Sequence, residues 1–124
     1  MHRLIAVAAS FFILTSAHAQ MPSPGAVETG IESNIAFSRD MAQQVPGLRD
    51  KICARQASPS DCRNDRLFSD LQQIYEGLAT AFGTKIRALR SNNSAEIDMA
   101  NRLINMLSNS MDSSIKQIAA KYPR

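Results

Sequence analysis

Hydrophobic residues recur at intervals of three and four along most of the chain, which is the spacing of one face of an α-helix. The first such stretch covers residues 25–44, and its apolar face consists of Val27, Ile31, Ile35, Met41, Ala42 and Val45. Pro46 and Gly47 follow, and a proline inside a helix removes a backbone donor and clashes with the preceding turn. We therefore expect the first helix to end or kink sharply there, and a short second helix to cover residues 47–56.

A longer pattern predicts a third helix over residues 59–90. Ser58 is a favourable N-cap, and Asp61 completes a capping box three residues later. Gly77 and Gly83 lower intrinsic helicity and mark either a close helix approach or a bend. A wide apolar face, which we expect to pack against two neighbouring helices, is formed by Phe68, Leu71, Tyr75, Leu78, Phe82 and Leu89.

The last pattern predicts a helix over residues 94–121, with Asn93 as N-cap and Glu96 at its third position. Its apolar face consists of Ile97, Ala100, Leu103, Ile104, Leu107, Met111, Ile115 and Ile118. No alternating strand pattern of useful length occurs in the chain. The fold class predicted is all-α, a small antiparallel helical bundle of three main helices plus one short helix.

The first 19 residues have the pattern of a secretory signal peptide. A basic start at residues 1–3 precedes an apolar run at residues 4–14, and residues 17–19 read Ala-His-Ala. The alternatives are an uncleaved anchor and a buried N-terminal helix, but the run is shorter than the roughly 20 residues that span a bilayer. We expect a cleaved signal peptide at residues 1–19 and one soluble helical domain over residues 20–124, located in the periplasm or secreted.

Removal of that segment takes away both histidines, His2 and His18, and lowers the formal net charge from +3 by the loss of Arg3. The absence of histidine from the remaining chain excludes Ser-His-Asp and Cys-His nucleophile systems, and it also excludes histidine-ligated zinc, copper or haem. We therefore expect no metal and no cofactor. The small, mixed-sign charge also gives no reason to expect a nucleic-acid partner.

The two cysteines, Cys53 and Cys62, are expected to form one disulfide, because an even number of cysteines in an exported chain is typical of disulfide bonding. Eight residues lie between them, including the turn sequence Ser-Pro-Ser at 58–60. A redox-active pair is the alternative, but its usual spacing is two intervening residues. The bond would staple the ends of adjacent helices.

Basic residues gather around the expected disulfide and form the first candidate binding site. They are Arg49, Lys51, Arg55, Arg63 and Arg66. Such a rim suits an acidic protein, an anionic lipid headgroup or a carboxylate ligand. Asp50, Asp61 and Asp65 lie among them, so a solvated network of ion pairs is the alternative interpretation.

Three further groups of side chains on the predicted helices carry possible chemistry. Lys85 falls within the apolar face of the third helix, where it either binds an anion or extends its amine into water near the helix end. Met99 and Met106 flank the apolar face of the last helix, as an adaptable partner surface or as part of the core. Ser38 is expected to satisfy its hydroxyl on the preceding helical turn.

The function expected from these features is that of a small exported, non-enzymatic binding protein, of the inhibitor, immunity, chaperone or accessory-assembly type. Its partner would be another exported protein, and a homodimer is possible. One alternative is a histidine-free enzyme of the chorismate mutase kind, which clamps a dicarboxylate with positioned cations; the candidates, which would converge inside a dimer, are Arg39, Arg55, Lys85 and Arg102. Another is a carrier of an apolar ligand in an internal pocket.

Overall fold

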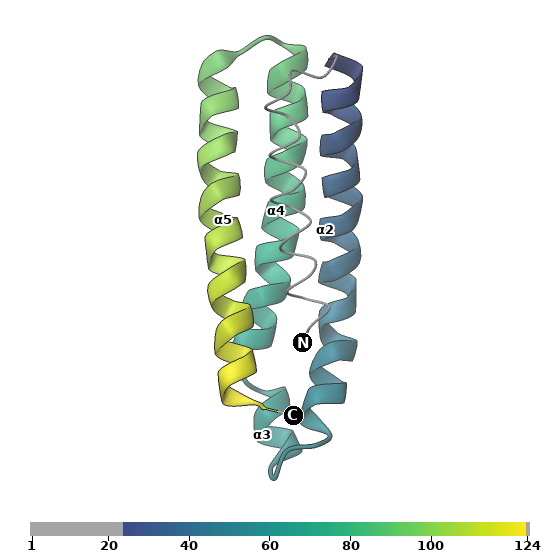
Figure 1. Ribbon diagram of the computed structural model, residues 1–124, viewed down its shortest axis with the longest axis vertical. Helices are drawn as coiled ribbons and strands as arrows, with labels where there is room; N and C mark the ends of the chain where they lie inside the picture. The colour runs from purple at the N-terminus through teal and green to yellow at the C-terminus, as the bar shows by residue number, and fades with distance from the viewer. Residues whose placement is uncertain (1–23, 124) are drawn as a thin grey trace.

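The computed structural model describes residues 24–123, which form four helices and no strand. The predicted signal peptide at residues 1–19 lies outside the described residues. The long helices α2 (Pro24–Cys53), α4 (Arg66–Arg90) and α5 (Ser94–Lys121) lie side by side, with α4 antiparallel to both of its neighbours and the short α3 (Pro59–Arg63) at one end (Figure 1). The predicted all-α bundle of three main helices plus one short helix is thereby confirmed.

The middle helix, α4, holds the bundle together. It packs against α2 on one side and α5 on the other, whereas α2 and α5 have few contacts with each other. The predicted wide apolar face of α4 is correspondingly buried, with Leu71, Tyr75 and Leu78 fully inaccessible to water. Its neighbours contribute further fully buried side chains, which include Ile31 and Val45 from α2 and Met111 and Ile118 from α5.

The first helix does not end where the sequence predicts. α2 continues through Pro46 to Cys53, so the separate short helix expected over residues 47–56 is the last part of α2. The physical reason is burial: Val45 before the proline and Ile52 after it lie on the same covered face of α2. Both side chains are buried together only if the helix continues through Pro46. The free energy gained by their burial outweighs the cost of the proline to helix stability.

The helix expected over residues 59–90 is divided into α3 and α4. Ser58 stands at the N-cap of α3, but its hydroxyl donates to the Asp61 carboxylate at 2.8 Å and does not cap the backbone, so the predicted capping box is wrong. Asp65 instead caps α4 by accepting from the Leu67 amide at 3.0 Å. The predicted cap of the last helix is confirmed, since Asn93 accepts from the Glu96 amide at 3.2 Å.

Gly77 marks a close approach of α4 and α5. A Cβ built at this position would lie 3.3 Å from Leu107 Cδ1. Leu107 therefore rests against the α4 backbone. A close approach is thereby confirmed at Gly77, whereas a Cβ built at Gly83 meets only Arg87 of the same helix, so no close approach occurs there among the described residues.

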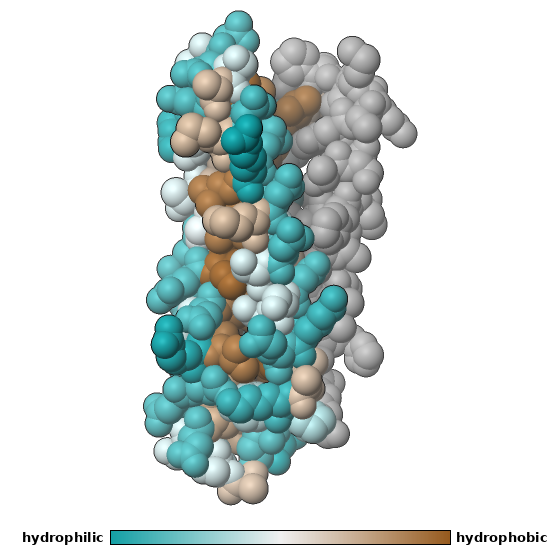
Figure 2. Space-filling model, turned by 90° about the vertical axis from the view of Figure 1, so that its left-hand side faces the viewer, coloured by the Kyte–Doolittle hydropathy of each residue, from teal (hydrophilic) through white to brown (hydrophobic). Residues whose placement is uncertain are grey.

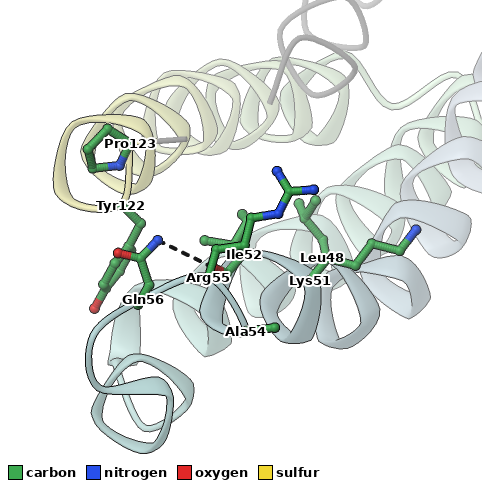
Figure 3. Close-up of a pocket in the computed structure, with 8 residues that line it drawn as sticks. All are labelled: Leu48, Lys51, Ile52, Ala54, Arg55, Gln56, Tyr122 and Pro123. Carbon is green, nitrogen blue, oxygen red and sulfur yellow. Dashed lines mark hydrogen bonds between the residues drawn. The ribbon is translucent and has the colours of Figure 1, made fainter.

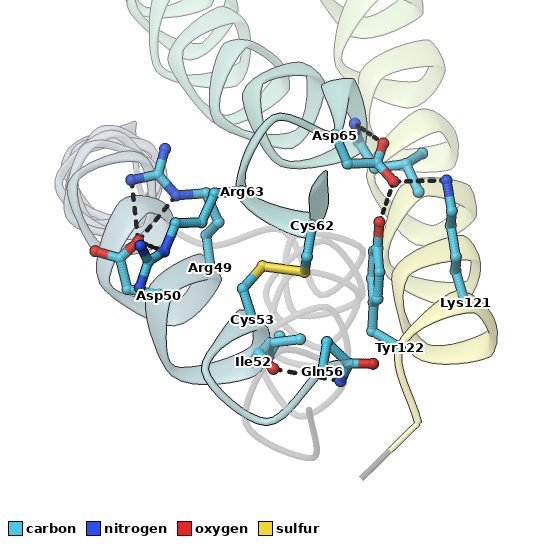
Figure 4. Close-up of a disulfide and its surroundings, with 11 residues drawn as sticks. Arg49, Asp50, Ile52, Cys53, Gln56, Cys62, Arg63, Asp65, Lys121 and Tyr122 are labelled. Carbon is cyan, nitrogen blue, oxygen red and sulfur yellow. Dashed lines mark hydrogen bonds and ion pairs between the residues drawn. A yellow bond between two sulfur atoms is a disulfide. The ribbon is translucent and has the colours of Figure 1, made fainter. Parts of the chain in front are cut away.

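A polar clasp fixes the end of α5 to the start of α4. The Tyr122 hydroxyl donates to the Asp65 carboxylate, and Lys121 Nζ lies 2.7 Å from the same oxygen (Figure 4). The Tyr122 ring also stacks on Phe68, with 5.8 Å between the ring centroids. Burial raises the pKa of Asp65, but the hydrogen bonds from Lys121, Tyr122 and the Leu67 amide outweigh it and lower the pKa to about 2.

The continuous α2 helix leads to the first prediction. A proline in a helix interior destabilises the folded state by about 3 kcal/mol, because it lacks a backbone donor and clashes with the preceding turn, and Pro46→Ala removes this penalty. The same substitution makes the unfolded chain more flexible, which lowers the free energy of unfolding by roughly 1 kcal/mol. We expect the free energy of unfolding in urea to rise by about 2 kcal/mol. Gly47→Ala, where a Cβ meets nothing within 4 Å, should add about 1 kcal/mol. A loss of stability in Pro46→Ala would contradict this account.

The clasp leads to a second prediction, on pH. The pKa of Asp65 is lower in the folded than in the unfolded state, so its stabilising contribution is complete above the ordinary value of 3.8 and disappears as pH falls through about 2. We expect Asp65→Asn to lower the free energy of unfolding by about 2 kcal/mol at pH 7 and hardly at all at pH 2. Asp98→Asn, which removes an exposed carboxylate from α5, is the control and should show no such difference.

Candidate functional site

The outer face of α5 carries the exposed large hydrophobic side chains of the described chain. Met99, Leu103 and Met106 are 68%, 41% and 57% exposed, and we call these three residues the α5 stripe. Their spacing of four and three residues places them on one face of the helix. Figure 2 shows a narrow, interrupted row of hydrophobic patches on this side of the molecule.

The exposure of the α5 stripe shows that its two methionines lie outside the core, and it corrects the placement expected for Leu103. Met99 and Met106 are exposed and do not belong to the core. Periodicity places Leu103 on the covered face of the last helix, and that prediction is wrong. The physical reason is that α5 has one main neighbour, α4, which covers only part of the apolar face of α5.

The adjoining edge of α4 adds little that would repel an apolar partner. Thr80 and Thr84 follow Gly77 at helical spacings of three and seven, so they lie on the edge of α4 that approaches α5. Their hydroxyls donate to the carbonyls of Glu76 and Thr80, at 3.2 and 3.1 Å. Because both hydroxyls are satisfied within α4, a partner seated beside the α5 stripe need not supply hydrogen bonds to them.

The predicted disulfide between Cys53 and Cys62 is formed. It joins the last residue of α2 to α3, with the two Cα atoms 5.4 Å apart (Figure 4). Both residues are buried. The bond therefore fixes the loop over residues 54–58 at the end of the bundle where the clasp also lies.

The structure does not bring the five basic residues of this end into one surface. Arg49 and Arg63 both approach the Asp50 carboxylate, at 3.1 and 3.8 Å, as in the ion-pair alternative. Lys51 and Arg55 instead line a pocket, and Arg66 is exposed at the start of α4. The sequence shows that these charges are close along the chain, but not which of them Asp50 neutralises.

The pocket lies between the end of α2 and the last described residues, and its volume is about 350 Å³. Figure 3 shows Arg55 rising beside Ile52, with Gln56, Tyr122 and Pro123 on its other side, while Lys51 extends away along α2. The lining is mixed, apolar and cationic: Leu48, Lys51, Ile52, Ala54, Arg55, Gln56, Tyr122 and Pro123. Sequence reasoning missed it because Tyr122 and Pro123 come from the far end of the chain.

Several polar groups are buried or half-buried within the bundle. Burial lowers the pKa of Lys85, which is half-buried and for which the described residues provide no ion pair. The hydroxyls of Ser38 and Tyr75 are buried without a hydrogen-bond partner in the described chain, so the expected bond from Ser38 to the preceding turn is absent. Burial, assisted by the charge of Asp112, raises the pKa of Tyr75.

The cations of the alternative charge clamp do not converge within one chain. Arg39 lines a surface hollow between α2 and α4 together with Arg87 and Arg90, whereas Arg55 lines the pocket at the opposite end of the bundle. Arg102 is exposed on α5. Within residues 24–123, no group of three or more histidine, cysteine, aspartate or glutamate side chains is placed to hold a metal ion.

Two general findings complete the description of the molecule. Among the helices described in residues 24–123, none has the length and apolarity needed to cross a bilayer. No family model, curated protein or solved structure matches the chain.

Proposed function

We propose that this chain is an exported, non-enzymatic binding protein that engages another exported protein through the α5 stripe. The observation that carries the proposal is the exposure of Met99, Leu103 and Met106 side by side on one helix. Contiguous apolar surface of this kind costs solubility and is typical of interaction sites. Methionine supports the same role, since its flexible thioether adapts to a partner surface.

The disulfide and the residue inventory support the other two parts of the proposal. A Cys53–Cys62 bond is stable in oxidising compartments, as expected for a chain whose start has the pattern of a signal peptide. Residues 20–124 contain no histidine, which removes the commonest general base of enzymes. A binding protein needs no such base.

The partner that fits the stripe best is an amphipathic helix. Spacings of four and three residues on α5 match the spacing with which a second helix presents its own apolar anchors. Three side chains fall well short of the roughly 800 Å² per partner that a stable interface of standard size buries. The stripe alone would therefore give a small interface with any partner, and a single helix is enough to cover it.

The experiment compares capture by three forms of the oxidised protein from the native exported fraction, with quantitative mass spectrometry. Met99→Lys/Met106→Lys places charges on the stripe, and Asn105→Lys/Asn109→Lys places the same charges on exposed positions elsewhere on α5. We expect one stoichiometric partner with the wild type and the control pair. With the stripe pair, its Kd should rise about a hundredfold, because two methionines lose their burial.

Circular dichroism spectra should show the same helical content in all three forms. Equal capture by the stripe pair and the wild type would overturn the proposal. So would a wild-type protein that retains no partner at all, or a retained partner that binds without a helical segment.

A further inference from the structure

We infer that the pocket at the disulfide end of the bundle binds a small monocarboxylate that carries a short apolar body. This site lies at the end of α2, and none of its lining residues belongs to the α5 stripe. The inference is therefore independent of the protein partner proposed above. Three features carry it: the walls are fixed, the cations have no acidic partner among the described residues, and the remaining lining is apolar apart from Gln56.

Both walls of the pocket are held by interactions outside it. On one side, the bond between Cys53 and Cys62 fixes the chain that bears Ala54, Arg55 and Gln56. On the other, Tyr122 is held by its hydrogen bond to Asp65 and by stacking on Phe68. A ligand would therefore meet a preformed site and spend little of its binding energy on ordering the protein.

The cations of the pocket differ from their neighbours in having no acidic partner within residues 24–123. Arg49 and Arg63 are neutralised by Asp50, whereas Lys51 and Arg55 are not paired with any described carboxylate. Arg55 stands in the middle of the lining and Lys51 at its edge (Figure 3). A guanidinium presents a planar fork of donors that matches a carboxylate, so Arg55 is the expected contact and Lys51 adds long-range attraction.

The apolar lining determines the rest of the ligand. Leu48, Ile52 and Pro123 offer hydrocarbon surface beside the Tyr122 ring. Arg55 is exposed, so water competes for its charge, and an anion without an apolar body should bind poorly. The volume of about 350 Å³ lies at the lower end of the range for ligand pockets, which suits a molecule of roughly ten non-hydrogen atoms.

The test is a titration of the oxidised, isotopically labelled protein with octanoate, followed by nuclear magnetic resonance of the backbone amides. We expect saturable shifts at residues 48–56 and 122–123, with a Kd of about 1 mM, in line with the affinity that a ligand of this size attains. Octanol, which lacks the charge, and acetate, which lacks the apolar body, should each bind at least about fivefold more weakly.

Variants and reduction test whether octanoate binds in this pocket through Arg55. Arg55→Gln should raise the Kd for octanoate about tenfold, whereas Arg66→Gln, which removes an exposed arginine at the same end of the bundle, should leave it unchanged. Reduction of the disulfide should weaken binding, and Met99→Lys/Met106→Lys should not. Unchanged affinity in Arg55→Gln, equal affinity for octanol, or shifts confined to the α5 stripe would each overturn the inference.

Discussion

The packing of α4 against two helices at once decides which surfaces of this protein are covered. Because α2 and α5 hardly touch each other, each has one main neighbour and a correspondingly narrow buried face. α2 fits this arrangement, since its large apolar side chains are covered or half-covered. α5 carries more apolar surface than α4 can cover, and the excess is the α5 stripe. The exposed apolar surface of α5 arises from the number of neighbours the helix has, not from an unusual local sequence.

The parts of the fold that depend on short stretches of sequence are predictable. Helical periodicity identifies three long amphipathic segments, the Asn93 cap follows from its own side chain and the next turn, and two cysteines in one chain point to one bond. The prediction at Pro46 is wrong because its local effect is real but smaller than the burial of residues on both sides of it. The prediction for Leu103 is wrong because periodicity tells which face is apolar, but not how much of that face a neighbour covers.

The pocket is less predictable, since its lining comes from two segments that are far apart in the chain, residues 48–56 and 122–123. The cap of α4 by Asp65 is local, but its clasp to Tyr122 joins residues 57 positions apart. Grouping basic residues by position places Lys51 and Arg55 together with Arg49 and Arg63. Only the tertiary structure shows that one pair serves Asp50 and the other lines a pocket.

The two ends of the bundle are held in very different ways. At one end a covalent bond joins α2 to α3 and a largely buried carboxylate joins α4 to α5, whereas at the other Arg90 reaches Glu28 and Glu32 at 3.4 and 3.7 Å through exposed side chains. Exposed ion pairs of this kind contribute little to stability. The mechanical stiffness of the bundle should therefore decrease from the disulfide toward the α4–α5 turn, where Met99 begins the stripe. A protein partner would therefore contact the more flexible part of the bundle, whereas a small ligand would bind at its more rigid end.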